Sequence, residues 1–397
     1  MVDEKLQLIL FNEESRQSNQ IELIASENFA SEAVRELCGS VFTNKYAEGY
    51  PGARYYNGCE YMDAVERYAQ HLVQKLYGCE FSNVQPHSGV NANTAVYQAF
   101  LKPGDRILGM DLASGGHLSH GAKPTLSGKV YKAYSYGVDK YGFIDYAQVE
   151  RVAIENGVDM IVAGASAYSR HIDWAKFKDI ARKVNAYLLC DMAHYSGLIA
   201  ARRYPSPLPY ADVVTSTTHK TLRGPRGGMI LWNNPNFTKR INSAIFPGTQ
   251  GGPLMNIIAA KAQCYKEALH PSFDDYIDAV IKNAKAMAEV FLEKGYNIIT
   301  KGTDSHVLLL DLSDKSISGR EAADLLEVND ITVNKNGVPN DPRNFIETSG
   351  IRIGTAAETT RGKDVEDFKI IAEHMICLLN TSPSPRDVEE SRMPSSA

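Results

Sequence analysis

The sequence lacks long hydrophobic runs, basic runs and closely spaced cysteines, and each absence excludes a class of protein. No segment approaches the ~20 consecutive apolar residues of a membrane-spanning helix. The formal net charge is −5 and no stretch is rich in Lys or Arg, which argues against nucleic-acid binding. The six cysteines form no C-x-x-C pair, and the first residues are acidic where a signal peptide is basic. We therefore expect a cytoplasmic protein that binds small molecules.

Short apolar segments alternate with helical ones through most of the chain. Strand-like runs at 106–110, 158–164 and 186–191 occur together with helical patterns at 146–156 and 174–184. This alternation predicts the α/β fold class, with a large domain whose mostly parallel sheet is covered by helices on both faces. Beyond Pro253, two long helical stretches and then alternating apolar runs predict a smaller C-terminal α+β domain.

The predicted domain organisation has four parts: an N-terminal helical segment (1–35), the large domain (36–264), the small domain (265–380) and a tail (381–397). The tail is rich in serine and proline and has almost no large apolar residue, so we expect it to be disordered. Its composition breaks with the rest of the chain, which makes it a candidate for non-native sequence.

Lys220 stands between a β-like run at 213–218 and a loop of glycines, prolines and arginines. Such a lysine can be a structural charge, a phosphate-binding charge or an amine that forms a Schiff base. Asp191 ends another apolar run, and ligands of open α/β sheets bind outside the carboxyl ends of the strands. Alone, Asp191 reads as a helix cap and Lys220 as a solvated residue. Together they suit pyridoxal phosphate, whose aldehyde needs an amine and whose pyridine nitrogen needs a carboxylate.

A phosphate-binding site should accompany such a pair. Ser88 and Gly89 precede a helix whose free N–H groups form an anion site, although a plain helix cap is the alternative. Gly251 and Gly252 form a second flexible loop. His117 and His120 form H-x-x-H, but their loop has no nearby carboxylate or thiol and is a poor zinc site, so no metal is expected. The alternative for His117 is stacking on a flat heterocycle.

Two further features suggest ligand binding. The loop 44–58 holds Tyr46, Glu48, Tyr55 and Tyr56 among glycines, and it is either a binding loop or a solvated polar loop. Arg352 lies inside an apolar strand pattern. Because a buried guanidinium needs a partner, we expect Arg352 to meet a carboxylate of the protein or of a substrate.

Six segments together resemble one family. "IELIASENFAS", "TNKYAEGYPGARYYNGCEYMD", "DMAHYSGLIA", "VVTSTTHKTLRGPRGGMIL", "FPGTQGGPL" and "VNKNGVPNDPR" closely resemble serine hydroxymethyltransferases, in the same order, over about 12–380. The resemblance implies an aspartate-aminotransferase-like fold with a pyridoxal-phosphate-binding large domain. It also implies transfer of the serine hydroxymethyl carbon to tetrahydrofolate, which yields glycine and methylenetetrahydrofolate. The family builds each active site from two chains, so we expect a homodimer or a pair of dimers.

The family pattern also implies a role for individual residues. Lys220 corresponds to the Schiff-base lysine, Asp191 to the partner of the pyridine nitrogen and His117 to the residue stacked on the ring. Phosphate contacts are implied for Tyr46, Ser88, Gly89 and His219, and for Gly251 and Gly252 of a neighbouring subunit. Ser166 and His194 correspond to residues near the cofactor's phenolic oxygen.

Substrate contacts follow from the same resemblance. Ser26 and Arg352 correspond to residues that hold the amino-acid carboxylate. Glu48 would handle protons near the serine hydroxyl and the folate, with Tyr55 and Tyr56 beside it, and sequence leaves open whether it acts as acid or base. Leu112, Gly116, Leu118 and Asn336 resemble positions that line the folate site.

Some positions depart from the family pattern. Ser114 replaces a frequent histidine, and "NFI" at 344–346 replaces a common "SPF" beside the folate site. These changes leave two alternatives, a folate-independent aldolase or racemase-like enzyme on β-hydroxy amino acids and a catalytically silent paralogue. Retention of the residues that carry the chemistry, Lys220, Asp191, His117, Glu48 and Arg352, argues against a silent paralogue.

Overall fold

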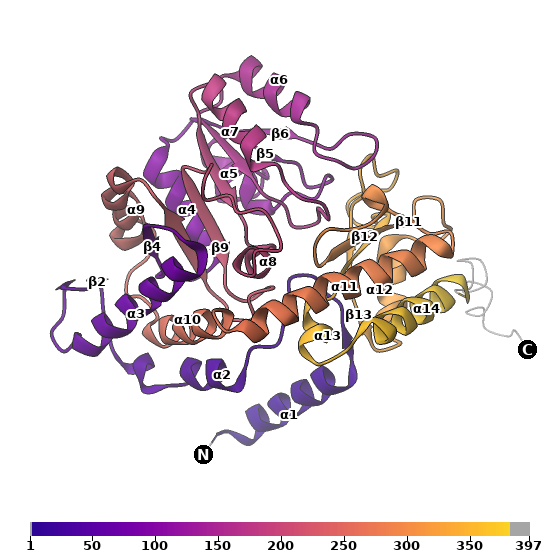
Figure 1. Cartoon of the computed structure of the whole chain (residues 1–397), viewed down its shortest axis with the longest axis horizontal. Coiled ribbons are helices and arrows are strands. Elements are labelled where there is room, and N and C mark those ends of the chain that lie inside the picture. The colour runs from indigo at the N-terminus through magenta and orange to yellow at the C-terminus, as the bar shows by residue number, and fades with distance from the viewer. Residues whose placement is uncertain (1, 382–397) are drawn as a thin grey trace, which may run out of the picture.

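A seven-stranded sheet forms the centre of the larger part of the molecule (Figure 1). The structure is a computed structural model that describes residues 2–381. The strand order is β4-β10-β9-β8-β7-β5-β6. The bounds are β4 (Phe81–Asn83), β5 (Arg106–Met110), β6 (Lys132–Tyr136), β7 (Met160–Ala163), β8 (Tyr187–Asp191), β9 (Val213–Thr217) and β10 (Gly228–Trp232). Strands β6, β5, β7, β8 and β9 pair in parallel, and β10 runs antiparallel to both of its neighbours. The predicted α/β class with a mostly parallel sheet is confirmed.

Helices cover both faces of this sheet, as the alternation predicted. They are α3 (Glu60–Tyr77), α4 (Gly89–Phe100), α5 (Leu126–Val130), α6 (Tyr146–Asn156), α7 (Trp174–Lys183), α8 (Ser196–Ala200), α9 (Thr238–Ser243) and α10 (Met255–Ala268). Successive strand residues enter different cores: Leu188 belongs to a core that also contains residues of α3, α7 and α10, whereas Leu189 belongs to one that contains residues of α4 and α9. Since a strand buried on both faces has no polar side, these strands read as continuous apolar runs.

A second, four-stranded sheet forms the core of the C-terminal part, in the order β11-β12-β15-β14. Its strands are β11 (Asn297–Ile298), β12 (Val307–Asp311), β14 (Asn334–Asn336) and β15 (Gly350–Gly354), and its helices are α11 (Pro271–Glu293), α12 (Gly319–Glu327), α13 (Ala356–Thr360) and α14 (Val365–Thr381). Helix α11 joins the two parts, because Ile277 packs in the large core and Phe291 in the small one. The predicted boundary at 265 stays a prediction.

The N-terminal segment reaches both parts of the molecule. It comprises α1 (Glu4–Asn19), β1 (Ile21–Glu22) and α2 (Glu32–Cys38), and β1 pairs in parallel with β13 (Ile331–Thr332). Leu23 enters the small core and Val34 the large one. Of the predicted tail, all residues after Thr381 lie outside the described part. Within residues 2–381, no helix is both long and apolar enough to cross a membrane.

Candidate active site

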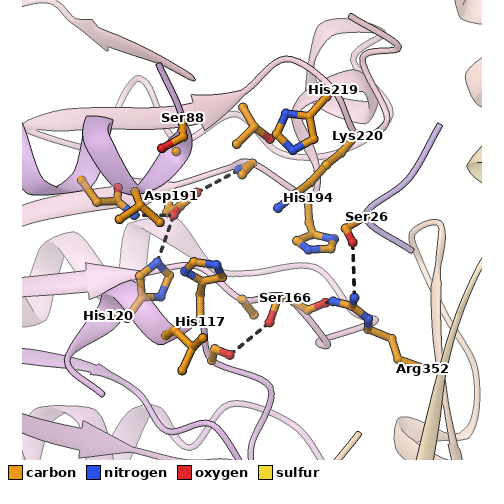
Figure 2. Close-up of a pocket in the computed structure, with 18 of the residues that line it drawn as sticks. Ser26, Ser88, His117, His120, Ser166, Asp191, His194, His219, Lys220 and Arg352 are labelled. Atoms are coloured by element: carbon orange, nitrogen blue, oxygen red, sulfur yellow. Dashed lines mark hydrogen bonds and ion pairs between the residues drawn. The ribbon is translucent and has the colours of Figure 1, made fainter. Parts of the chain in front are cut away.

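A pocket of about 450 Å³ opens at the carboxyl ends of the parallel strands, between the large sheet and the small C-terminal sheet (Figure 2). Most of the predicted site residues line it: Ser26, Ser88, Gly89, Leu112, Gly116, His117, Leu118, Ser166, Asp191, His194, His219, Lys220, Asn336 and Arg352. They come from segments spread over the whole chain, and the sheet brings them together because successive parallel strands end at the same edge.

Lys220 follows β9 by three residues and points into this pocket (Figure 2). Its side chain is enclosed by the protein, and only 8% of the residue is exposed. Burial lowers its pKa to about 8, although the Asp191 charge opposes the shift. A lysine amine with a lowered pKa is more often neutral, which is the form that attacks carbonyl carbon.

Asp191 ends β8 and is held ionised by its neighbours. Its Oδ2 accepts hydrogen bonds from Asn93 at 2.9 Å and from His120 at 3.0 Å, and its Oδ1 accepts one from the Ala193 backbone at 3.0 Å. Burial would raise the pKa of Asp191, yet the bonds from His120 and Asn93 hold it well below its usual range. Thr215 in turn donates to Asn93 at 2.6 Å, which fixes the amide orientation. The carboxylate therefore offers a rigid negative charge inside the pocket.

The two histidines of the H-x-x-H motif have different positions. His117 lines the pocket, its Nδ1 lies 2.8 Å from Ser119 Oγ, and burial lowers its pKa to about 4. His120 is buried beneath His117 and contacts Asp191. The ring centroids of His117 and His120 are 5.5 Å apart. Among residues 2–381, no cluster of three or more His, Cys, Asp or Glu side chains is arranged to hold a metal ion. The neutral His117 ring is free to stack on a flat ligand.

One end of the pocket is suited to an anion. Ser88 caps α4 by accepting the Asn91 N–H at 3.2 Å, which leaves the first N–H groups of the helix directed at the pocket. A Cβ at Gly89 would lie 2.8 Å from Thr217 Cγ2, so glycine allows close backbone approach. Thr217 Oγ1 is buried and has no hydrogen-bond partner within the described chain. Burial, and then the Lys220 and Arg226 charges, lower the pKa of His219 to about 3.

The opposite end of the pocket holds a partly buried guanidinium, that of Arg352 (Figure 2). Arg352 donates to the Ser166 carbonyl at 2.9 Å, to Asn334 Oδ1 at 3.0 Å and to Ser26 Oγ at 3.4 Å. Burial lowers its pKa to about 10. No carboxylate of residues 2–381 forms an ion pair with it, although a buried charge without a counter-ion is costly. The expected carboxylate partner of Arg352 is therefore one that the described chain does not supply.

Ser166 and His194 lie between these two ends. Ser166 donates to the Gly116 carbonyl at 3.0 Å, which ties the segment after β7 to the segment after β5. His194 stacks on His306 with ring centroids 5.6 Å apart, and burial lowers the pKa of His194 well below its ordinary value. His306 bonds to the Ala25 carbonyl at 3.1 Å, so this pair links the pocket to the small sheet and the N-terminal segment.

Six predicted site residues do not line the pocket: Tyr46, Glu48, Tyr55, Tyr56, Gly251 and Gly252. They form an exposed patch of their own, named here the tyrosine patch. Tyr56 Oη lies 3.3 Å from Glu48 Oε2, and a Cβ built on Gly251 would lie 3.3 Å from Glu48 Oε1. Gly252 approaches the Tyr46 ring with similar closeness. One chain thus carries two separate sets of predicted site residues.

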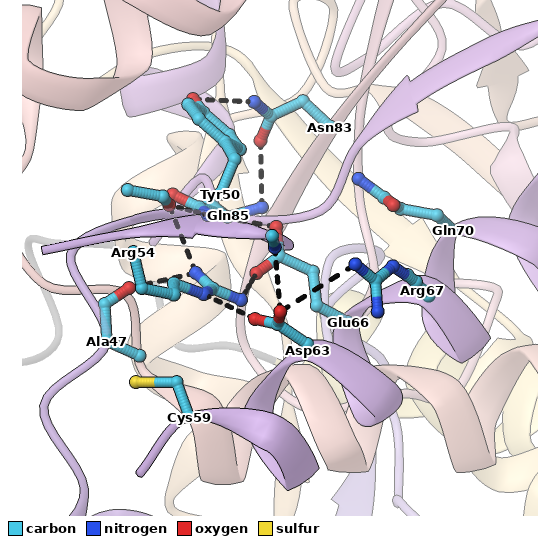
Figure 3. Close-up of polar contacts among 12 residues, drawn as sticks. Ala47, Tyr50, Arg54, Cys59, Asp63, Glu66, Arg67, Gln70, Asn83 and Gln85 are labelled. Carbon is cyan, nitrogen blue, oxygen red and sulfur yellow. Dashed lines mark hydrogen bonds and ion pairs between the residues drawn. The ribbon is translucent and has the colours of Figure 1, made fainter. Parts of the chain in front are cut away.

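A buried ionic network connects the hairpin beside the tyrosine patch to helix α3 and to the loop after β4 (Figure 3). Arg54, at the end of the hairpin of β2 (Gly49–Tyr50) and β3 (Ala53–Arg54), donates to Glu66 Oε2 at 2.6 Å and to Asp63 Oδ1 at 2.8 Å. Gln85 donates to Glu66 Oε1 at 2.9 Å and to the Gly49 carbonyl at 3.0 Å. Since Gln85 belongs to the loop before Ser88, the network connects the patch to the anion end of the pocket.

Sequence reasoning missed several residues that shape the pocket. Asn93 and His120 hold Asp191, Asn334 holds Arg352, and Arg226 lines the anion end. Asn93 lies one turn along the helix that Ser88 caps, and that position was a usable signal. His120 had no such signal, because its spacing from His117 fits a metal motif as well as a carboxylate partner.

Known proteins resemble this chain over nearly its full length. The family model for serine hydroxymethyltransferase matches residues 1–375. A serine hydroxymethyltransferase of Lactobacillus acidophilus is 56% identical over 379 residues, which is 95% of this chain and 92% of that protein. Serine hydroxymethyltransferase 1 of Pseudomonas aeruginosa is 58% identical over 362 residues, 91% of this chain and 87% of that protein. The chain belongs to the serine hydroxymethyltransferase family.

Proposed function

We propose that this chain catalyses the reversible transfer of the serine hydroxymethyl carbon to tetrahydrofolate, with pyridoxal phosphate as its cofactor. The observation that carries the proposal is the convergence of Lys220 and Asp191 in one pocket, the amine with a lowered pKa and the carboxylate held ionised. Both are the groups that this cofactor requires. The membership of the family and the identities of 56–58% support the same activity.

The residues of the pocket fit pyridoxal phosphate. The unpartnered hydroxyl of Thr217, the Ser88 hydroxyl and the free N–H groups of α4 would bind its phosphate, with His219 beside them. Lys220 would hold its aldehyde carbon and Asp191 its protonated pyridine nitrogen. When bound, the cofactor supplies an electron-withdrawing ring that stabilises negative charge on the amino-acid α-carbon. His117 would cover one face of the ring and exclude water from it.

The other end of the pocket supports recognition of an amino acid. Arg352 and Ser26 would bind the serine carboxylate, which provides the counter-ion that the guanidinium lacks. This contact orients the bond that breaks relative to the ring. Leu112 and Leu118 expose apolar side chains at the pocket, and with Gly116 and Asn336 they would contact the folate.

The tyrosine patch supports a homodimer in which each pocket is completed by the other chain. Glu48 lies outside the pocket of its own chain, so the partner's Glu48 would handle the proton of the serine hydroxyl. Helix α1 has no buried residue and exposes Leu6, Ile9 and Phe11, as expected of a surface that a second copy covers. The six free cysteines support a cytoplasmic location, which we include in the proposal.

The test is an assay of the purified protein with serine and tetrahydrofolate, in which glycine is measured. We expect activity in the wild type, none in Lys220→Ala, and loss of the visible absorbance of bound pyridoxal phosphate in that variant. Cleavage of β-hydroxy amino acids without tetrahydrofolate, and none of the transfer, would replace the proposal by the folate-independent aldolase. Failure of the wild type to bind pyridoxal phosphate would refute both enzymes.

A further inference from the structure

Lys261 is a buried lysine that the proposed function does not use. It lies on α10, only 1% of the residue is exposed, and no carboxylate of residues 2–381 forms an ion pair with it. Its Nζ instead donates to three backbone carbonyls, those of Val84 at 2.7 Å, Gly228 at 2.8 Å and Pro86 at 3.0 Å. Burial lowers the pKa of Lys261 to about 7, whereas the three carbonyls favour its charged form because an ammonium has three N–H donors.

Two of the three carbonyls that Lys261 binds belong to the loop that leads into the anion end of the pocket, and the third is at the start of β10. Val84 and Pro86 precede Ser88, the cap of α4, by four and two residues. Gln250 holds the residues between, because its Nε2 donates to the Gln85 carbonyl at 3.0 Å and its Oε1 accepts the His87 N–H at 2.9 Å. Because the loop carbonyls face Lys261, the N–H groups at the start of α4, which follow the loop, face the pocket.

The packing around Lys261 leaves this loop little freedom. A Cβ at Gly227 would lie 2.4 Å from Lys261 Cε, and one at Gly228 would lie 2.3 Å from the Ser88 carbonyl oxygen. Real Cβ atoms do not approach so closely, so only glycine allows β10 to begin this near the lysine and the helix cap. The lysine, the strand and the cap therefore form one rigid unit.

The charge of Lys261 also acts at the anion end of the pocket. After burial, which is the larger cause, the Lys261 charge helps to lower the pKa of both His87 and His219. His219 lines the pocket beside Ser88 and Gly89. A positive charge that raises the cost of protonating these rings also attracts an anion bound next to them. Geometry and electrostatics thus point to the same end of the site.

We propose that Lys261 is a positioning residue for the phosphate group of the cofactor. It orients the loop 84–89 from behind and supplies a buried positive charge to the anion end, without touching the phosphate itself. The inference rests on the proposed function, because it takes the anion to be the phosphate of pyridoxal phosphate. A lysine that only stabilised the fold would affect ligands with and without phosphate alike.

The test compares the binding of pyridoxal 5′-phosphate with that of pyridoxal, which lacks the phosphate. Dissociation constants are measured by visible absorbance for the wild type, Lys261→Met and Lys266→Met. Lys266 lies on the exposed side of the same helix, so its variant removes an equal charge without the carbonyl contacts. We expect Lys261→Met to weaken pyridoxal phosphate binding about tenfold or more and pyridoxal binding less than about twofold, and Lys266→Met to change neither.

A second variant keeps the test decisive if Lys261→Met does not fold. Lys261→Gln retains two N–H donors for the carbonyls and lacks the charge, so it should show the same phosphate-selective loss to a smaller extent. Equal weakening of both ligands, or no weakening of either, would overturn the inference while the proposed function stood. A wild type that bound pyridoxal phosphate no better than pyridoxal would instead contradict the phosphate site of the proposed function.

Discussion

At the residue scale, Lys220 should change its reactivity with pH in a range where ordinary lysines do not. Its pKa is lowered to about 8 by burial, so the neutral amine becomes the major form above that pH. A lysine in water reaches this point only near pH ~10.4. We predict that the rate at which cofactor-free protein binds pyridoxal phosphate rises with pH and levels off above about 8. This rate can be measured by stopped-flow absorbance between about pH 6.5 and 9.5, a range that extends roughly one to two pH units on either side of the midpoint.

Asp191→Asn provides the control for this profile. The Asp191 charge favours the ammonium form of Lys220, so its removal should move the midpoint to lower pH. A rate that is flat across the range in the wild type would mean that the Lys220 amine does not limit binding.

Arg352 should determine the affinity for serine and not for the cofactor. Its three donor contacts depend on the planar guanidinium, which lysine cannot reproduce. We predict that Arg352→Lys lowers kcat/KM for serine about 10- to 100-fold, the range expected for a lost charged hydrogen bond. Steady-state kinetics, together with a titration of pyridoxal phosphate, checks the prediction. An equal loss of cofactor binding would assign Arg352 a structural role.

At the element scale, the hairpin of β2 and β3 depends on one buried ion pair. The side chains of Arg54 and Glu66 are 3% and 0% exposed, so removing one partner leaves the other as a buried charge. We predict that Arg54→Met lowers the free energy of unfolding by about 3–5 kcal/mol. Urea unfolding followed by circular dichroism measures the change.

Arg67 is the matched control on the surface of α3. Its side chain is 58% exposed and lies 3.7 Å from Asp63, so Arg67→Met should change the free energy of unfolding by less than about 1 kcal/mol. If both variants lost a similar amount of unfolding free energy, burial would not be the reason that the Arg54 contacts stabilise the protein.

At the scale of the whole molecule, two inactive variants should restore each other. Lys220 lies in the pocket and Glu48 in the tyrosine patch, so in the proposed dimer one active site takes them from different chains. In a mixed dimer of Lys220→Ala with Glu48→Gln, one site carries both changes and the other carries neither. We predict that unfolding and refolding an equal mixture recovers about a quarter of the wild-type activity, the statistical share of intact sites for random two-fold pairing. Glycine formation measures it, and no recovery would place both residues in the site of one chain.

Local features of the sequence were sufficient to predict the α/β class and part of the pocket, whereas the other pocket residues, such as Ser26, Ser166 and His194, were predicted only from the resemblance to the family. Asp191 and Ser88 were found because each stands where an apolar run ends or a helix begins, and both signals lie within a few neighbouring residues. Partners distant in sequence could not be found this way. His120 and Asp191 are 71 residues apart and meet only after the sheet has formed. The same holds for Arg352 and Ser166, which are separated by 186 residues.

The sequence by itself determined which segments become strands and helices, and therefore which polar residues arrive at the carboxyl edge of the sheet. The periodicity of apolar residues and the residues that begin or end helices and strands are local properties, so they can be recognised without knowledge of the fold. Only the tertiary structure decided what surrounds those residues: the carbonyls that receive Lys261, the ion pair under the hairpin, and the separation of Glu48 from the pocket of its own chain. Burial, charge and hydrogen bonding are sums over neighbours in space, and the chain acquires those neighbours by folding.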